Sequence, residues 1–388
     1  MSIRPKSKTL FNFKYFNINS IFHKNLFNFL FFKLILMKIL ITHELFPPDI
    51  VGGGETLTYK IAKELQKLGY DVKVITSGDP EIKIFDEIET IRIPVNRYFL
   101  NFSAPIISKH AKEVDLIHTS SGNMCFPSYI AAKNNKKPIC CYIHHIFGSN
   151  WKYVRGPIIG SLFEKVEKFV LTKNYDAIIF QNSLSKKIGL SIGINESNTY
   201  MLHPGIDYKK FQIKGIKKEG YVLFVGNFLM DKGICAIKGL NYLIEAAREL
   251  PSVKFIIVGG GKYLNTLKKT SPSNVNFVGP KEGRELVEIY NKASIFCLPS
   301  LAEGFGISIL EAMASGCSIV STIDIGQKGI LIEPKNSKSI VNGIKYYIEK
   351  KNEAEKDGKK NRKLAKKYTW KKYIDELTKI YDYITTKK

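Results

Sequence analysis

The sequence predicts an α/β protein built from two doubly wound domains. Short β-branched and apolar runs, typical of buried strands, alternate with longer stretches of helical periodicity. The alternation occurs in two successive blocks, and a chain of 388 residues is long enough for each block to bury its own core. The composition, 44% hydrophobic and 24% charged, is that of an ordinary globular protein.

The first block opens with a βαβ unit. A strand at 38–42 is followed by a loop that ends in three glycines, a helix at 56–68 and a second strand at 71–76. The glycine-rich turn therefore lies at the carboxyl end of the first strand. Further apolar runs predict strands at 116–118, 138–143 and 177–180 and a helix at 162–171.

The second block repeats the pattern after a stretch rich in glycine, proline and lysine at 204–219. Its predicted strands and helices, in chain order, are 221–226, 240–249, 254–258, 275–278, 284–291, 293–298 and 307–314. We expect an N-terminal domain at 37–212, a C-terminal domain at 220–365 and a C-terminal helix at 366–388. The lysine-rich stretch 359–384 is predicted to be helical, with Tyr368, Trp370 and Tyr381 on its buried face.

Residues 1–36 differ from the rest of the chain. They contain six Lys and Arg residues, no acidic residue and many phenylalanines, and their apolar run is shorter than the ~20 residues of a membrane-spanning helix. Two interpretations remain open. The segment is either an upstream extension before a natural start at Met37, or a basic aromatic segment that lies on a membrane surface.

The net charge of +24 requires anionic partners. An anionic membrane surface or anionic substrates fit this charge, whereas the basic residues are spread along the chain and form no nucleic-acid-binding module, so we expect no nucleic acid partner. The six cysteines form no C-x-x-C pair and mostly lie in apolar runs, which favours a cytoplasmic protein, peripheral at the inner membrane face if it binds membranes.

Two glutamates, Glu303 and Glu311, stand on either side of a Gly-Phe-Gly segment. Glu303 follows the predicted strand 293–298, at the carboxyl end where open α/β sheets bind ligands. The amides of Gly306, Ile307 and Ser308 begin the next helix and offer a phosphate site. Glu311 lies four residues after Ile307 on the same helical face. The pattern predicts a phosphate-bearing ligand with one carboxylate near its reacting end and the other near its hydroxyls.

The segment 299–313 resembles the E-x7-E signature of family 4 glycosyltransferases, which are retaining enzymes of the GT-B fold. In that fold two Rossmann-like domains face a cleft, and a C-terminal helix follows. The resemblance implies hexosyl transfer from a UDP- or GDP-linked sugar to a glycan or lipid-linked acceptor in cell-surface glycan biosynthesis. A catalytically degenerate nucleotide-sugar-binding protein of the same fold is the alternative. A dehydrogenase is disfavoured, because Gly52-Gly-Gly is not a G-x-G-x-x-G directly after a strand.

The resemblance also assigns roles to residues. Glu303 would contact the donor sugar, Glu311 would hold the ribose hydroxyls, and His144, at the end of strand 138–143, would stabilise the developing positive charge; Glu303 and His144 are thus the catalytic candidates. Gly53 and Gly54 would let the backbone approach the donor.

For the donor diphosphate, the family uses an arginine and a lysine after the first strand of the second domain. Asn227 occupies the arginine position, and both Lys232 and Lys238 fit the lysine. The Gly-Gly loop that the family carries after the position of Ser321 is shortened. No D-x-D sequence occurs, so we expect neither a metal nor a cofactor other than the nucleotide-sugar substrate.

Overall fold

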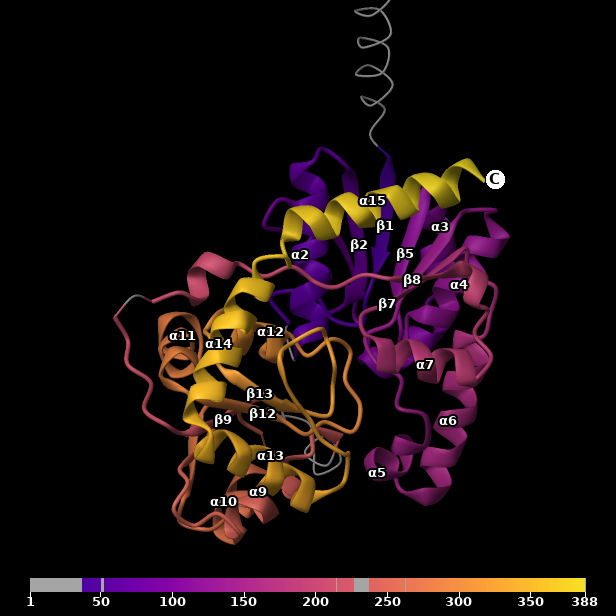
Figure 1. Cartoon of the computed structure of the whole chain (residues 1–388). Coiled ribbons are helices and arrows are strands. Elements are labelled where there is room, and N and C mark those ends of the chain that lie inside the picture. Colours follow the sequence, from indigo (N-terminus) through magenta and orange to yellow (C-terminus); the bar gives the residue numbers. More distant parts are fainter. Residues whose placement is uncertain (1–36, 50–51, 214, 227–236, 262, 388) are drawn as a thin grey trace, which may run out of the picture.

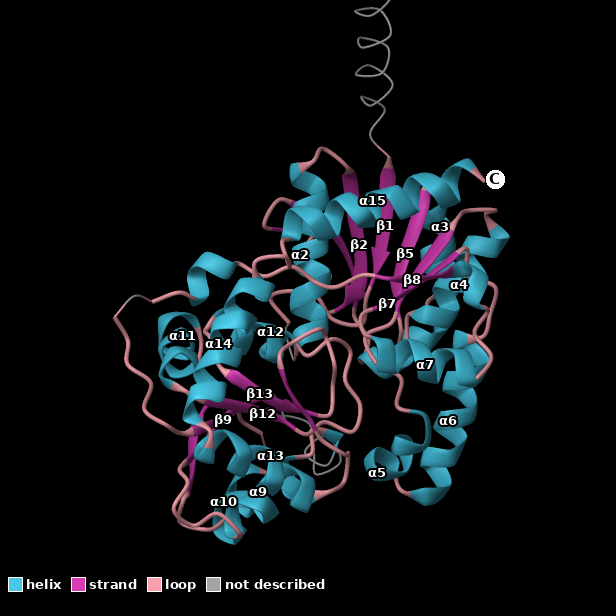
Figure 2. Cartoon of the chain, viewed as in Figure 1, coloured by secondary structure: helices cyan, strands magenta, loops and turns pink. Residues whose placement is uncertain are grey.

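The computed structural model describes residues 37–49, 52–213, 215–226, 237–261 and 263–387. The leader at 1–36, Asn227 and Lys232 lie outside these ranges. The described chain forms two sheets, each covered by helices on both faces (Figures 1 and 2). Among the described helices, none combines the length and apolar character needed to cross a membrane.

The first sheet has the strand order β3-β4-β2-β1-β5-β6-β7-β8. All neighbouring strands are parallel except β3 and β4, which are antiparallel. The strands are β1 Lys38–Thr42, β2 Asp71–Ser77, β3 Ile84–Phe85, β4 Ile88–Ile93, β5 Leu116–Ser120, β6 Ile139–Tyr142, β7 Ala177–Phe180 and β8 Thr199–Met201. The helices are α2 Gly53–Lys67, α3 Ala104–Ala111, α4 Cys125–Asn134, α5 Trp151–Arg155, α6 Pro157–Leu171 and α7 Ser183–Ser191.

The second sheet is wholly parallel, with the order β11-β10-β9-β12-β13-β14. In this doubly wound sheet the strand order runs outward in both directions from the pair β9 and β12, which are its first and fourth strands. The strands are β9 Val222–Val225, β10 Phe255–Val258, β11 Val275–Gly279, β12 Ile295–Leu298, β13 Ser318–Ser321 and β14 Gly329–Leu331. The helices are α9 Leu240–Arg248, α10 Leu264–Thr270, α11 Gly283–Lys292, α12 Ile307–Ala314, α13 Ser337–Glu349 and α14 Lys351–Ala365.

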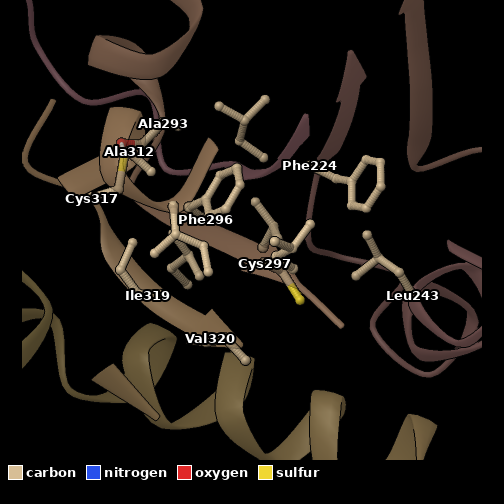
Figure 3. Close-up of a cluster of buried hydrophobic side chains, with 14 of the residues drawn as sticks. Phe224, Leu243, Ala293, Phe296, Cys297, Ala312, Cys317, Ile319 and Val320 are labelled. Atoms are coloured by element: carbon tan, nitrogen blue, oxygen red, sulfur yellow. Dashed lines mark hydrogen bonds between the residues drawn. The ribbon is translucent and has the colours of Figure 1, made fainter. Parts of the chain in front are cut away.

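Both sheets carry apolar side chains on both faces, because helices cover a parallel sheet on each side. In the second domain, Phe224 and Phe296 from adjacent strands lie among Leu243, Ile319 and Val320, all of them buried (Figure 3). In the first domain, separate clusters fill the two faces of the sheet. The predicted α/β class with two domains is confirmed.

The C-terminal helix α15, Trp370–Thr386, crosses back to the first domain (Figure 1, yellow). Its residues Tyr373, Leu377 and Tyr381 belong to the buried cluster of the first sheet. The single helical stretch predicted at 359–384 is wrong, because the helix breaks at 366–369. The Thr369 hydroxyl accepts a hydrogen bond from the Lys372 amide at 3.2 Å and so starts a new helix there.

Candidate active site

The candidate site lies where the carboxyl ends of strands from the two sheets meet. The loop after β12 carries Glu303. The next residue, Gly304, allows this loop to contact the other domain closely. A Cβ atom added to Gly304 would overlap the carbonyl oxygen of His144, which follows β6 in the other domain. Only glycine permits this approach of the two backbones.

Two side chains of the first domain hold the Glu303 loop from the other side. Asn182 Nδ2 donates to the Glu303 carbonyl oxygen at 3.1 Å and also to the carbonyl oxygen of Gly304. Ser185 Oγ donates to the Glu303 carbonyl oxygen at 3.1 Å. Asn182 is fully buried and is also the N-cap of α7, where its Oδ1 accepts from the Ser185 amide. The first domain therefore fixes this loop through its backbone and not through the Glu303 carboxylate.

The Glu303 carboxylate is bound within its own domain. Lys238 Nζ donates to Glu303 Oε2 at 2.6 Å, and Ser300 Oγ donates to the same oxygen at 3.2 Å. Lys238 precedes Gly239, the N-cap of α9, which has a φ of 70° and packs against the Pro299 carbonyl where a Cβ atom would not fit. The tight turn thus places a lysine beside the carboxylate at the strand switch point.

His144 faces this loop from the first domain. Its amide donates to Ser121 Oγ at 3.0 Å, and its ring lies edge-on to those of His43 and Tyr142, with centroids 5.2 and 5.3 Å away. Burial, with the charges of nearby histidines, lowers the pKa of His144 well below its usual range, so the ring is neutral. Its Nε2 is buried and has no hydrogen-bond partner among the described residues.

His145 also lies close to the pair. Its pKa falls to about 4, chiefly through burial and secondly through the Lys238 charge, while Glu303 opposes the shift. It is therefore a neutral neighbour of Lys238 and Glu303 near pH 7.

The glycine-rich loop after β1 meets the same place. A Cβ atom at Gly54 would lie 3.5 Å from His144 Nδ1, and one at Gly53 would lie 3.9 Å from the Ile307 side chain. Gly306 is the N-cap of α12, whose first backbone bond runs from the Ile309 amide to the Gly306 carbonyl at 2.8 Å. The amides of residues 306–308 thus form the open start of this helix, beside the Gly53 loop.

Glu311 lies one turn further along α12 and is partly buried. Tyr290 of α11 donates its hydroxyl to Glu311 Oε2 at 2.7 Å. Burial raises the pKa of Glu311 to about 7, and the Tyr290 hydrogen bond and the Lys210 charge partly offset that effect. Near neutral pH this carboxyl group is therefore present in both protonation states.

Two family profiles match the chain, and together they run from residue 51 to residue 364. The profile "Glycosyltransferase Family 4" matches residues 51–210, and "Glycosyl transferases group 1" matches residues 207–364. The chain belongs to the family 4 glycosyltransferases. The predicted family is thereby confirmed.

Individual relatives agree with the family. The glycosyltransferase is 26% identical over 357 residues to the capsular polysaccharide biosynthesis glycosyltransferase CapM of Staphylococcus aureus, across 82% of this chain and 91% of CapM. It is 23% identical over 343 residues to the UDP-Gal:alpha-D-GlcNAc-diphosphoundecaprenol alpha-1,3-galactosyltransferase of Escherichia coli, across 79% of this chain and 87% of that protein.

Solved structures show the same fold. The structure of Anabaena HepE in complex with UDP-glucose superposes with a TM-score of 0.68 at 18% identity, covering 89% of this chain and 99% of HepE. The GT-B fold predicted for the glycosyltransferase is confirmed.

The structure brings several of the predicted site residues together at the domain contact. They are Glu303, Lys238, His144, Gly53, Gly54 and Ile307, with Gly306 and Ser308 at the start of the same helix. Glu311 lies on that helix but contacts Tyr290. Of the two candidate lysines, Lys238 contacts Glu303. Lys232 and Asn227 lie outside the described residues. The catalytic and binding roles of all these residues stay predictions.

The sequence reasoning missed Asn182, Ser185 and Tyr290. Asn182 had a local signal, since an asparagine directly after a strand and before a helical stretch is a typical N-cap. Nothing local indicates its second role, because its carbonyl partners lie more than 120 residues away. Tyr290 has the helical spacing of a core residue, so its hydroxyl contact with Glu311 could not be read from the pattern.

The described residues contain no cluster of three or more His, Cys, Asp or Glu side chains that could hold a metal ion. The segment after β13, which the sequence predicts to be shortened, contacts its own domain. Thr322 Oγ1 donates to the Ser300 carbonyl at 2.6 Å, and the Ile325 amide donates to Gln327 Oε1 at 2.7 Å.

Proposed function

We propose that this glycosyltransferase moves a hexosyl group from a nucleotide sugar to a glycan or lipid-linked acceptor, with retention of configuration and without a metal ion. The observation that carries the proposal is the convergence of Glu303, Lys238 and His144 at the contact between the two domains. A carboxylate, a cation and a neutral imidazole are the groups needed to orient a sugar, neutralise a diphosphate and stabilise an oxocarbenium-like state.

The donor would bind along α12. Its diphosphate would lie at the amides of residues 306–308, with Lys238 as countercharge, and Glu311 would accept hydrogen bonds from the ribose hydroxyls. Glu303 and the unpartnered Nε2 of His144 would then contact the sugar ring.

In the reaction, the bond between the anomeric carbon and the diphosphate oxygen breaks as the acceptor oxygen bonds to the same face of the sugar. The acceptor proton passes to the departing phosphate, so no protein nucleophile is required. Lys238 stabilises the charge that develops on the leaving group, and His144 stabilises the positive charge on the ring.

The relatives support the choice of substrates. HepE was crystallised with UDP-glucose, and the Escherichia coli relative is named for a UDP-linked galactose and a diphosphoundecaprenol acceptor. CapM is named for capsular polysaccharide synthesis. We therefore propose a UDP-linked donor before a GDP-linked one, and an acceptor used in cell-surface glycan synthesis on the cytoplasmic side of a membrane.

A degenerate nucleotide-sugar-binding protein is the second candidate. Asn227 in place of the usual arginine, and the shortened segment after Ser321, favour it. Transfer and hydrolysis assays over a panel of UDP-, GDP- and ADP-sugars separate the two candidates. Turnover that is lost in Glu303→Gln supports the enzyme. Absence of turnover with every donor, together with nucleotide binding that is unchanged in Glu311→Ala, would refute it.

A further inference from the structure

The outward face of α6 is apolar. Ile158, Leu162, Val166 and Phe169 follow one another at helical spacing, and their side chains are exposed; we call these four residues the α6 stripe. Ile158 is 85% exposed and Leu162 60%. Ile159 and Phe163 lie next to the stripe and are exposed as well. Soluble proteins rarely leave so many large apolar side chains uncovered along one helix.

Basic residues border the α6 stripe. Lys165 and Lys168 project from one side of it and are exposed, and Lys173 lies at its end, with its ammonium 3.5 Å from the centre of the Phe169 ring. Lys152 and Arg155 lie on the adjoining helix α5. The acidic side chains of α6 are Glu164 and Glu167, whose helical positions face away from the stripe.

The opposite face of α6 is fixed to the domain. Glu167 accepts hydrogen bonds from the amides of Phe147 and Gly148 at 3.1 and 2.7 Å. Gly160 packs directly on the backbone of Lys152, where a Cβ atom would not fit. The stripe is therefore held outward by the fold, as the outer edge of the first domain (Figure 1, α5 and α6).

A chain of aromatic contacts joins this region to the candidate site. The ring centroids of His145 and Phe147 are 4.1 Å apart, and those of Phe147 and Trp151 are 4.6 Å apart. The ring centroid of Trp151 is in turn 5.0 Å from that of Phe163, beside the stripe. The segment that leaves the site after β6 thus leads directly into α5 and α6. A surface docked on the stripe would hold this segment in place near Glu303 and Lys238.

We propose that the α6 stripe and its bordering lysines dock on an anionic lipid surface, with the helix lying in the plane of the interface. An apolar helix face flanked by lysines is the combination that partitions into headgroup regions, and each lysine adds attraction to anionic lipids. A second copy of this chain fits less well as the partner. A two-fold contact between two stripes would bring their bordering lysines together, and like charges repel. The inference rests on the proposed function only for the lipid-linked acceptor that such docking would supply.

Vesicle sedimentation of the full chain tests the stripe. In vesicles of phosphatidylglycerol and phosphatidylcholine, we expect Ile158→Gln/Leu162→Gln/Val166→Gln to lower the partition coefficient about tenfold or more. The matched control, Leu68→Gln/Ile84→Gln/Leu331→Gln, removes equally exposed apolar side chains elsewhere and should bind like the wild type. Circular dichroism checks that both variants are folded, and unchanged vesicle binding by the folded stripe variant would overturn the proposal.

The charge contribution is tested separately. Lys165→Gln/Lys168→Gln should weaken binding to the anionic vesicles about fivefold for each lysine, and should not change binding to pure phosphatidylcholine vesicles. Lys359→Gln/Lys363→Gln on α14 makes the same change in net charge at a distance and should bind almost as tightly as the wild type. An equal loss in both variants would mean that net charge alone acts, and the proposed surface would be wrong.

Two further measurements distinguish the rival occupants and the proposed function. In sedimentation velocity, the wild type and the stripe variant should have the same oligomeric state. An oligomer that forms in the wild type but not in the stripe variant would assign the stripe to a second copy and overturn the proposal. Sugar transfer to a water-soluble acceptor should be equal in wild type and stripe variant. If the wild type binds vesicles through the stripe but transfers no sugar, the proposed function fails while the membrane surface stands.

Discussion

At the scale of single residues, the ion pair between Lys238 and Glu303 is the most informative contact. Both side chains are partly buried, and the carboxylate also accepts from Ser300. The Glu303 carboxylate is already held by two hydrogen bonds before a nucleotide sugar binds, so it needs little reorganisation during the reaction. Such preorganisation is the condition for electrostatic stabilisation of a transition state. The pair is therefore better explained as a prepared site than as a surface salt bridge, which contributes little to stability.

The first prediction concerns Glu303→Gln. We expect kcat to fall about 100- to 1000-fold, because the amide keeps the size of the side chain but not its charge. The dissociation constant of the nucleotide sugar should change much less, since the diphosphate and ribose contacts proposed above do not involve Glu303. Steady-state kinetics and calorimetric donor binding check this, with the exposed Glu245→Gln on α9 as control. A loss of donor affinity as large as the loss of kcat would contradict the assigned role.

The second prediction concerns pH. Because the pKa of Glu311 is raised to about 7, this carboxyl group is mostly protonated at pH 6 and mostly ionised at pH 8. A carboxylate accepts hydrogen bonds from ribose hydroxyls better than the neutral acid does, so affinity for UDP-glucose should increase up to about tenfold across that range. His145 titrates near 4 and does not contribute there. Calorimetry at several pH values should show a flat profile in Glu311→Gln; a slope that persists in the variant belongs to another group.

The stability of the unliganded protein should show the opposite trend. A carboxyl group whose pKa is raised by folding contributes stability below its unfolded pKa, and loses it as the pH rises through about 7. Relative to Glu311→Gln, the wild type should therefore become less stable to urea between pH 5 and pH 8. Donor binding would reverse this trend by stabilising the ionised form.

At the scale of elements, α7 connects the two domains through its N-cap. Asn182 caps the helix with its oxygen and uses its nitrogen to hold the Glu303 loop. One residue thus has a local role and a long-range role, and a substitution can separate them.

The third prediction uses Asn182→Ser. Serine is also a good N-cap, so α7 should stay intact, but its short side chain does not reach the carbonyl groups of residues 303 and 304. We expect kcat to fall about tenfold or more, while the free energy of unfolding falls by about 1–3 kcal/mol because the Gly304 carbonyl loses its partner. The Glu303 carbonyl keeps its hydrogen bond from Ser185 Oγ. Asn336→Ser, at the N-cap of α13, makes the same change away from the site and should leave kcat unaltered. Equal kcat values in the two variants would assign Asn182 a capping role alone.

Elements with a clear apolar period were predictable from the sequence. The strand 38–42 and the helix 307–314 have the predicted bounds, because a buried strand and a glycine-capped helix carry strong local signals. Helix α2 begins at Gly53 rather than at 56, since Glu55 Oε2 accepts from the Gly52 amide and extends the first turn. β3, β8 and β14 were missed, as edge strands of two or three residues have no readable period. The longer strands β4 and β13 were missed as well.

The site was predictable only where local pattern and sheet topology agree. Glu303 follows a buried strand at the point where doubly wound sheets bind ligands, so its place could be inferred. The meeting of Gly304 with His144, and of Gly53 with the Ile307 side chain, depends on how the two domains pack. No periodicity in either segment encodes that contact.

At the scale of the whole molecule, the chain passes twice between the domains, and the two passages lie side by side. The Ile206 amide donates to the Tyr368 carbonyl at 3.0 Å, and Gly205 packs on the backbone of Trp370 without room for a Cβ atom. The rings of His203, Phe305 and Tyr368 lie within 6.0 Å of one another. A rotation of one domain relative to the other would therefore bend the chain at one narrow place.

The fourth prediction follows from the second passage, which brings α15 onto the first sheet. Tyr381 is fully buried there, and its hydroxyl lies 2.6 Å from Nδ1 of the buried His118. Burial lowers the pKa of His118 to about 3, so its ring is neutral and depends on this hydrogen bond. Tyr381→Phe leaves Nδ1 unpaired and should lower the free energy of unfolding of the first domain by about 1–3 kcal/mol.

Tyr383→Phe provides the matched control, since Tyr383 lies on the same helix with 48% of its side chain exposed. Its free energy of unfolding should change by no more than about 0.5 kcal/mol. Urea unfolding followed by circular dichroism measures both variants. If the two shift alike, α15 is held by its apolar contacts alone. If only Tyr381→Phe is destabilised, the hydrogen bond between Tyr381 and His118 helps to hold α15 on the first sheet, and α15 is a structural part of the first domain.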